Sequence, residues 1–142
     1  MDGLGPAEAV KAIRGRLDAL LPDPSVAWVA PCEAAALPRR EAGEADRAPQ
    51  VVVLVFGPAS GWVDGALWVG HCEQWGVAEV YCDEPAVGAL TVLLRGRDGL
   101  DWVEGETAWE SAALGLRFAV EGRALGIGKS EAGCGGGAGR RL

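Results

Sequence analysis

The sequence predicts an α/β or α+β fold in which a mixed sheet is flanked by helices. Six consecutive apolar residues, Val51 to Phe56, lie between proline and glycine residues, as expected of a strand that is buried on both faces. The segment Trp62 to Trp75 can form about four helical turns and is followed by Gly76, a favoured residue just after a helix. A second apolar strand, Val77 to Cys82, comes next. Strand, helix and strand therefore form a βαβ-like unit.

The other elements are expected to pack onto this unit. Pro6 to Leu21 predicts an amphipathic helix, because its apolar residues recur at helical spacing. An Asp-Gly pair at Asp98-Gly99 predicts a hairpin. The remaining expectations are a strand at Val26 to Val29, a helical turn at Cys32 to Leu37, a solvated loop at Pro38 to Ala48, hairpin strands at Ala89 to Leu94 and Leu100 to Val103, a connection with one helical turn around Trp109, and a last strand at Leu116 to Val120.

Length and composition indicate one domain. The chain has 142 residues, of which 49% are hydrophobic, and a formal net charge of −7. We expect a domain over residues 1–125 and a flexible glycine-rich tail over 126–142. The acidic balance opposes binding to a phosphate backbone. No apolar run approaches the ~20 residues of a membrane span and no secretion signal is evident, so a cytoplasmic protein without a membrane partner is expected.

Two motifs that suggest ligands fail on their spacing. The four cysteines form no CxxC pair, and His71 and Cys72 are neighbours that a helix points in different directions, so we expect no metal site and reduced thiols. Gly128-Lys129-Ser130 resembles part of a phosphate loop, but no glycine stands five residues before Gly128 and no helix is expected after it. The sequence predicts no cofactor from either motif.

A resemblance to a known family involves several features at matching offsets. They are Pro49, Val51 to Val53, Pro58, Asp64, Gly76-Val77, Glu79, Tyr81 and Pro85, together with an upstream strand from Pro24 and a downstream Leu-Gly-Leu at Leu114 to Leu116. This pattern, from Pro24 to Leu125, resembles the Uma-two family of restriction endonucleases in the PD-(D/E)xK nuclease superfamily. The resemblance implies a restriction-endonuclease-like fold, with an N-terminal region shorter than is usual in that family.

The chain departs from the family pattern at its catalytic positions. The resemblance places the family's first metal-binding aspartate at Ser25, its central glutamate at Leu54 and its helix lysine at Trp68. Hydrolysis of a phosphodiester in this way needs carboxylates to hold a cation such as Mg²⁺, and a polar group to activate water. Leucine and tryptophan supply neither, so we expect a pseudoenzyme without a metal cofactor.

The alternative is an active, Mg²⁺-dependent endonuclease with a rearranged site. Asp23 and Asp64 are the fallback catalytic residues, and Gln50, Glu73 and Glu79 are further candidates. DNA binding would need a basic patch, for which Arg14, Arg16, Arg39 and Arg40 are available. A decayed reading frame that folds without a selected role is a third, weaker reading.

The favoured function is a non-catalytic role in dimerisation or in binding another protein. The helix from Trp62 to Trp75 bears on this because it has two apolar rows. We expect Val63, Ala66, Leu67 and Gly70 to face the sheet. Trp68, Cys72 and Trp75 would then either fill the family's catalytic cleft against Leu54, which is the favoured outcome, or form an exposed binding patch.

Overall fold

The computed structural model describes residues 6–33, 49–57, 62–85, 87–103, 108–122 and 124–129. Within them, the elements are α1 (Pro6–Leu20), a 3-10 turn η1 (Pro24–Val26), β1 (Ala27–Pro31), β2 (Val51–Val55), α2 (Trp62–Trp75), β3 (Glu79–Glu84), β4 (Ala89–Gly96), β5 (Gly99–Val103), β6 (Ala108–Ser111), β7 (Leu116–Glu121) and β8 (Ala124–Lys129). The mixed α+β architecture expected from the sequence is confirmed.

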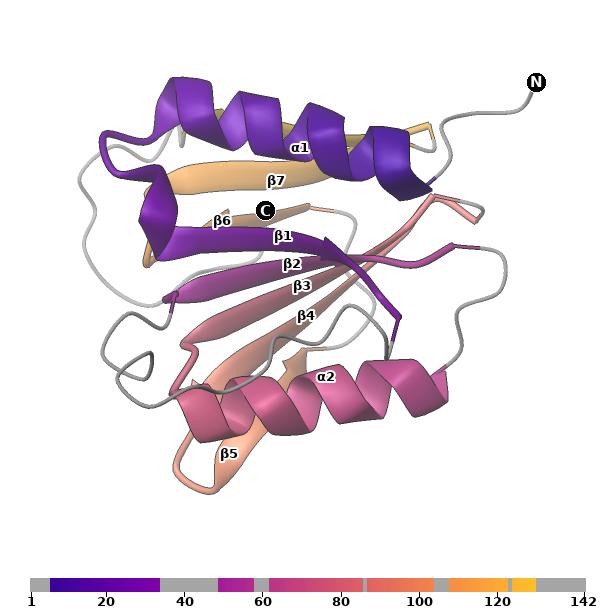
Figure 1. Ribbon diagram of the computed structural model, residues 1–142. Helices are drawn as coiled ribbons and strands as arrows, with labels where there is room; N and C mark the ends of the chain where they lie inside the picture. Colours follow the sequence, from indigo (N-terminus) through magenta and orange to yellow (C-terminus); the bar gives the residue numbers. More distant parts are fainter. Residues whose placement is uncertain are drawn as a thin grey trace.

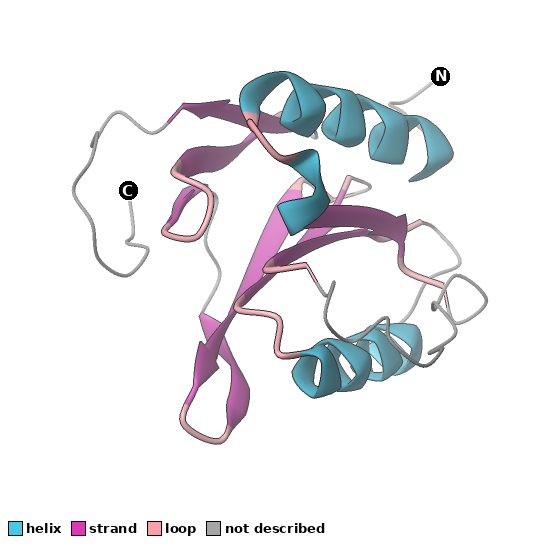
Figure 2. Cartoon of the chain, turned by 60° about the vertical axis from the view of Figure 1, so that its left-hand side comes forward, coloured by secondary structure: helices cyan, strands magenta, loops and turns pink. Residues whose placement is uncertain are grey.

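Two sheets form the body of the fold. The larger has the order β1-β2-β3-β4-β5, with β1, β2 and β3 parallel and β4 and β5 antiparallel. The smaller is an antiparallel sheet of β6, β7 and β8. Figure 1 shows α2 on one face of the larger sheet, and α1 with the smaller sheet on the other. Figure 2 shows the β4–β5 hairpin extending beyond the layers.

Strand β2 is the centre of the core because all five of its side chains are buried. Val51, Val53 and Val55 pack into a cluster with α1 and the smaller sheet, whereas Val52 and Leu54 pack into a second cluster with α2. This two-sided burial explains the uninterrupted apolar run in the sequence. Since β2, α2 and β3 follow one another and β2 pairs with β3 in parallel, the predicted βαβ unit is confirmed.

The C-terminal region differs from the sequence prediction. Trp109 lies in β6 rather than in a helical turn, and its side chain packs in the core between the sheets. Strand β8 continues to Lys129, so residues 126–129, which we expected in the flexible tail, are part of the smaller sheet. Ile127 is buried there. The expected turn at Cys32 to Leu37 lies mostly outside the described residues, as do the expected loop at Pro38 to Ala48 and residues 130–142.

Two arginines of α1 attach the helix to both sheets. Arg14 donates a hydrogen bond of 2.8 Å to the carbonyl oxygen of Ala27 in β1, and it forms an ion pair with Asp18 at 3.2 Å. Arg16 donates a hydrogen bond of 2.9 Å to the carbonyl oxygen of Ile127 in β8. Both guanidinium groups therefore have structural roles. Arg39 and Arg40, the other members of the expected basic patch, lie outside the described residues.

Candidate functional site

Three polar residues share one face of the central strand β3. Side chains alternate along a strand, so Glu79, Tyr81 and Asp83 all point toward α1 and the smaller sheet. Their register partners on β2 are Val51, Val53 and Val55, which belong to the core cluster on that face. All three polar side chains are buried. A row of two acids and a phenol inside an apolar core is the most unusual chemical feature of the described chain.

Glu79 is held by a complete set of hydrogen bonds. Tyr81 donates its hydroxyl hydrogen to Glu79 Oε1 at 2.8 Å, and Ser111 donates to the same oxygen at 2.5 Å. The backbone N–H of Ala113 donates to Glu79 Oε2 at 3.1 Å. The Ser111 hydroxyl in turn accepts a hydrogen bond from the backbone N–H of Leu114 at 3.1 Å. This network joins β3 to the β6–β7 turn, and it compensates the burial of the carboxylate.

Tyr81 serves the network as a donor. Burial first, and then the neighbouring Glu79, raise the pKa of Tyr81, so the phenol keeps its proton at ordinary pH. Its ring stacks on Phe118 of β7 with a centroid separation of 4.2 Å and an interplanar angle of 15°. Tyr81 therefore donates a hydrogen bond within the Glu79 network and also makes an apolar contact between the two sheets through its ring.

Asp83 lacks such compensation. Its side chain is 2% exposed, and its Oδ1 atom has no hydrogen-bond partner within the described part of the chain. Val55 and Leu90 flank it in the sheet, and both are buried apolar residues. Burial, and to a smaller extent the charge of Glu84, raise the pKa of Asp83 to about 7. This acid therefore holds its proton far more tightly than an exposed aspartate does.

The positions that the family resemblance makes catalytic do not form a polar site here. Leu54 and Trp68 have no exposed surface, and both belong to the cluster between α2 and the larger sheet. In the sheet, Leu54 lies beside Ala30 and Cys82. The Trp68 indole N–H donates a hydrogen bond of 3.0 Å to the carbonyl oxygen of Glu33. The space around Leu54 is thus apolar core, in which a carboxylate would have no partner.

The fallback carboxylates are dispersed. Asp23 is fully exposed and accepts hydrogen bonds from the backbone N–H and the hydroxyl of Ser25, at 3.1 and 2.6 Å, which lower the pKa of Asp23. This is a turn-forming contact that begins the 3-10 turn η1. Asp64 lies in the first turn of α2, and Glu73 is exposed near its end. Glu79 is on the opposite face of the larger sheet from α2.

No metal centre is formed by the described residues: no group of three or more His, Cys, Asp or Glu side chains there has an arrangement suited to a metal ion. Cys32, Cys72 and Cys82 are buried and free of disulfide bonds. Burial raises the pKa of Cys32 to about 11 and that of Cys72 to about 12, so both thiols stay protonated and pack as small apolar groups. Gln50 contacts the Glu79 strand through its backbone, since its carbonyl oxygen accepts hydrogen bonds from Ala78 and Glu79.

For helix α2, the favoured expectation that Trp68 is buried against Leu54 is confirmed, whereas the expectation that the Val63 row faces the sheet is wrong. Trp68 and Cys72 face the sheet and are fully buried, with Trp75 partly buried beside them. Val63 and Leu67, which we expected against the sheet, are 79% and 50% exposed. The row formed by Trp68, Cys72 and Trp75 packs on the sheet because burial of tryptophan removes more apolar surface from water than burial of Val63 and Leu67 would. Trp75 also packs edge-on against Trp28 of β1, with a centroid separation of 5.0 Å.

The outer face of α2 consequently carries exposed apolar side chains. At helical spacing it presents Val63, Ala66, Leu67, Gly70 and Gln74, all of them exposed, and the exposed carboxylate of Glu73 lies at its border. We call these five residues the outer α2 face. An exposed helix face in a globular protein normally carries charged side chains. On the α2 side of the larger sheet, Trp102 of the edge strand β5 is also 58% exposed.

Comparison of the chain with known protein-family models, curated proteins and solved structures finds no match. None of the described helices is long and apolar enough to cross a membrane. Leu54, Trp68 and Glu79 stand out from the sequence as positions of interest, whereas Ser111 and Asp83 do not. A signal for Asp83 was present, because it continues the alternation Glu79, Tyr81, Asp83 along a strand next to the fully apolar β2. Ser111 had none, since only the tertiary fold brings it to Glu79.

Proposed function

We propose that this protein is a non-catalytic relative of the Uma-two endonucleases that binds another protein, a second copy of itself being the first candidate. The observation that carries the proposal is the outer α2 face, on which Val63 and Leu67 are 79% and 50% exposed and which has a charged side chain, Glu73, only at its border. Contiguous apolar surfaces of this kind usually mark protein interfaces. Trp102, on the separate edge strand β5, is also exposed and is of a residue type that is enriched at interface hot spots.

Loss of hydrolysis is supported by the residues around Leu54. At the positions given by the family resemblance, Leu54 and Trp68 stand in place of the carboxylate and the cation that phosphodiester hydrolysis requires, and both side chains are packed into the core. The described carboxylates provide no substitute, because Asp23, Asp64 and Glu79 belong to three separate parts of the fold.

The binding role is tested by measuring the molar mass by light scattering over a range of protein concentrations. We expect a mass that rises with concentration in the wild type and stays at the monomer value in Leu67→Glu. The matched control is Val87→Glu, which places the same charge on an exposed apolar residue of the β3–β4 turn. A wild type that is monomeric at every concentration would exclude the second copy as the partner. Equal behaviour of the two variants would remove the outer α2 face from the proposal.

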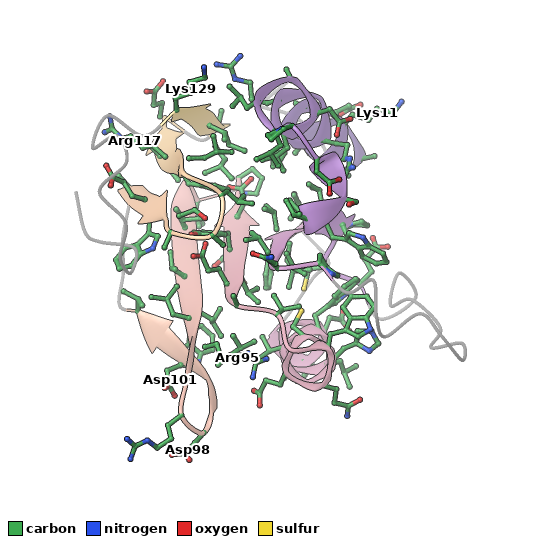
Figure 3. All side chains as sticks on the ribbon, turned by 90° about the vertical axis from the view of Figure 1, so that its left-hand side faces the viewer. Lys11, Arg95, Asp98, Asp101, Arg117 and Lys129 are labelled. Atoms are coloured by element: carbon green, nitrogen blue, oxygen red, sulfur yellow. The ribbon has the colours of Figure 1, made fainter. Side chains whose placement is uncertain are left out.

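The catalytic part is tested separately with plasmid DNA and Mg²⁺ or Mn²⁺. We expect no cleavage by the wild type. Cleavage that disappears in Asp23→Asn or Asp64→Asn, but persists in Asp98→Asn at the tip of the β4–β5 hairpin, would establish the active endonuclease instead. Asp98 is a suitable control because it lies at the exposed hairpin turn (Figure 3).

A further inference from the structure

The turn end of the β3–β4 hairpin, from Asp83 to Leu90, which we call its far end, covers a buried acid. Asp83 and Leu90 are register partners near the end of this strand pair, and only Glu84 and Ala89 pair beyond them. The Asp83 carbonyl oxygen accepts a hydrogen bond from the Phe56 N–H at 2.8 Å, and the Glu84 carbonyl oxygen accepts one from the Gly88 N–H at 2.9 Å. These backbone bonds hold the Asp83 carboxyl group inside the core.

The surroundings of Asp83 favour its neutral form. Pro31, Val55 and Leu90 lie in its row across the sheet, from β1, β2 and β4. The elements packed on this face contribute apolar side chains to the core, and these are Ala9, Ile13 and Leu17 of α1, Trp109 of β6, Leu116 and Phe118 of β7, and Ile127 of β8. None of these side chains carries a positive charge that could balance an ionised carboxylate, and the only polar group among them is the indole N–H of Trp109, which is buried and has no hydrogen-bond partner among the described residues.

The charged groups of the same elements lie elsewhere. On β3, Glu79 is four residues away in its own hydrogen-bond network and Glu84 points to the opposite face, from which its charge opposes ionisation of Asp83. Asp101 of β5 and Lys129 of β8 are exposed, and strand register places both at the Glu79 end of the face. Glu110 and Arg117 are register partners that alternate with the core residues, so they lie on the opposite face of the smaller sheet, where Glu110 is buried. The charged residues of α1 are exposed or only partly buried, and Arg14 and Arg16 bind backbone carbonyls.

We propose that Asp83 couples opening of the far end of the β3–β4 hairpin to release of a proton. While the hairpin is closed, the carboxyl group is confined to an apolar site and keeps its proton. Opening exposes the group to water, where it ionises. A rise in pH therefore favours the open form, and the hairpin end acts as a pH-dependent latch.

The expected response follows from the two pKa values of Asp83. The ordinary pKa is 3.8, and the pKa in the closed form is about 7. Between these values the open form has lost its proton and the closed form has not. The equilibrium constant for opening should therefore rise nearly tenfold from pH 5 to 6, about fivefold from pH 6 to 7, and level off above that.

The test is amide hydrogen exchange of the Phe56 and Gly88 N–H groups between pH 5 and 8, corrected for the intrinsic pH dependence of exchange. We expect their protection to fall about fiftyfold from pH 5 to 7 in the wild type and to be nearly constant in Asp83→Asn. In Glu84→Gln, which changes the neighbouring acid on the opposite face, the decrease should persist. The Gly115 N–H, bonded to the Ser111 carbonyl oxygen in the smaller sheet, is an internal reference and should show no such decrease.

A second measurement needs no variant. The carboxyl carbon of Asp83, followed by NMR in the wild type, should titrate with a midpoint well above that of an exposed aspartate. A midpoint near 4 would overturn the proposal, and so would equal pH dependence in the wild type and Asp83→Asn. If the Gly115 N–H loses protection in parallel with Phe56, the opening is global unfolding and the latch is rejected.

Discussion

The hydroxyl group of Tyr81 donates a hydrogen bond of 2.8 Å to the carboxylate of Glu79, two residues earlier on the same strand. Ser111 reaches the same carboxylate oxygen from the smaller sheet, 32 residues further along the chain. A buried acid is therefore satisfied by groups from two sheets, so its contribution is to fix how the sheets are placed on one another. Replacing any one donor leaves a buried carboxylate with one partner fewer.

The first prediction concerns this network. Tyr81→Phe keeps the stacking on Phe118 but removes the hydroxyl, and we expect it to lower the free energy of unfolding by about 1–3 kcal/mol, because bonds to a charged group are among the stronger ones. Urea denaturation measures the change. Thr91→Val is the matched control, because Thr91 lies on the opposite face of β4 and has no hydrogen bond from its hydroxyl within the described residues; it should change stability by less than about 0.5 kcal/mol.

A second prediction concerns Leu54, which has no exposed surface. Leu54→Glu should cost about 2–5 kcal/mol of stability, through lost packing and a buried carboxylate without partners. It should also fail to produce Mg²⁺-dependent DNA cleavage, since catalytic groups act as a unit. Leu67→Glu, a chemically identical change on the outer α2 face, should cost less than about 1 kcal/mol. Equal losses in the two variants would contradict the burial of Leu54.

A third prediction concerns the end of α2, where Arg95 of β4 acts as a cap. Its guanidinium group donates to the carbonyl oxygens of Cys72, Glu73 and Val77, at 3.3, 3.1 and 2.8 Å. Figure 3 shows Arg95 beside this helix. Arg95→Met should lower the unfolding free energy by about 1–3 kcal/mol, because a cation at the C-terminal end of a helix interacts favourably with its carbonyl groups.

The control for this variant is Arg97→Met, two residues later in the exposed β4–β5 turn. It removes the same charge from a position without these contacts and should leave thermal stability nearly unchanged. An Arg97 variant as unstable as the Arg95 variant would show that net charge, rather than capping, is responsible.

The fourth prediction is the pH dependence of global stability. The pKa of Asp83 is raised in the folded state, so the unfolded state loses this proton at lower pH than the folded state does. The unfolded state then binds fewer protons between pH 3.8 and about 7, and stability falls as pH rises through that window, by up to about 4 kcal/mol. Chemical denaturation of wild type and Asp83→Asn should show the variant gaining relative stability from pH 5 to 8. A difference that is independent of pH would contradict this.

A fifth prediction concerns DNA. With a net charge of −7 and with Arg14 and Arg16 bound to backbone carbonyls, the protein should bind duplex DNA more weakly than the usual non-specific range of ~10⁻⁴ to 10⁻⁶ M at physiological salt. A gel shift measures this binding. A retarded band at low micromolar protein that weakens with added salt would show that a basic surface exists.

The sequence by itself determined the elements whose local signals agree. The run Val51 to Phe56 predicts a strand buried on both faces, and β2 occupies its first five residues, while helix α2 has the bounds Trp62–Trp75 that its apolar content and Gly76 predicted. Gly76 has a φ of 78°, a left-handed conformation that glycine adopts without strain, which is why the helix ends there. Strand β8 was not predicted because its glycines have a low strand propensity. Pairing with β7 stabilises the strand in spite of this low propensity.

Only the tertiary structure decided which face of α2 is buried and which polar residues meet. Because α2 is apolar on both sides, its sequence alone does not determine which side packs on the sheet. The side that removes more apolar surface from water is buried, and here Trp68 is buried while Leu67 remains half exposed. The contact between Glu79 and Ser111 depends on how two separate sheets pack on each other. The spacing of the two residues in the sequence therefore does not predict that they meet. Asp83 likewise becomes unusual only because the elements around it close out water and offer its Oδ1 atom no hydrogen-bond donor among the described residues.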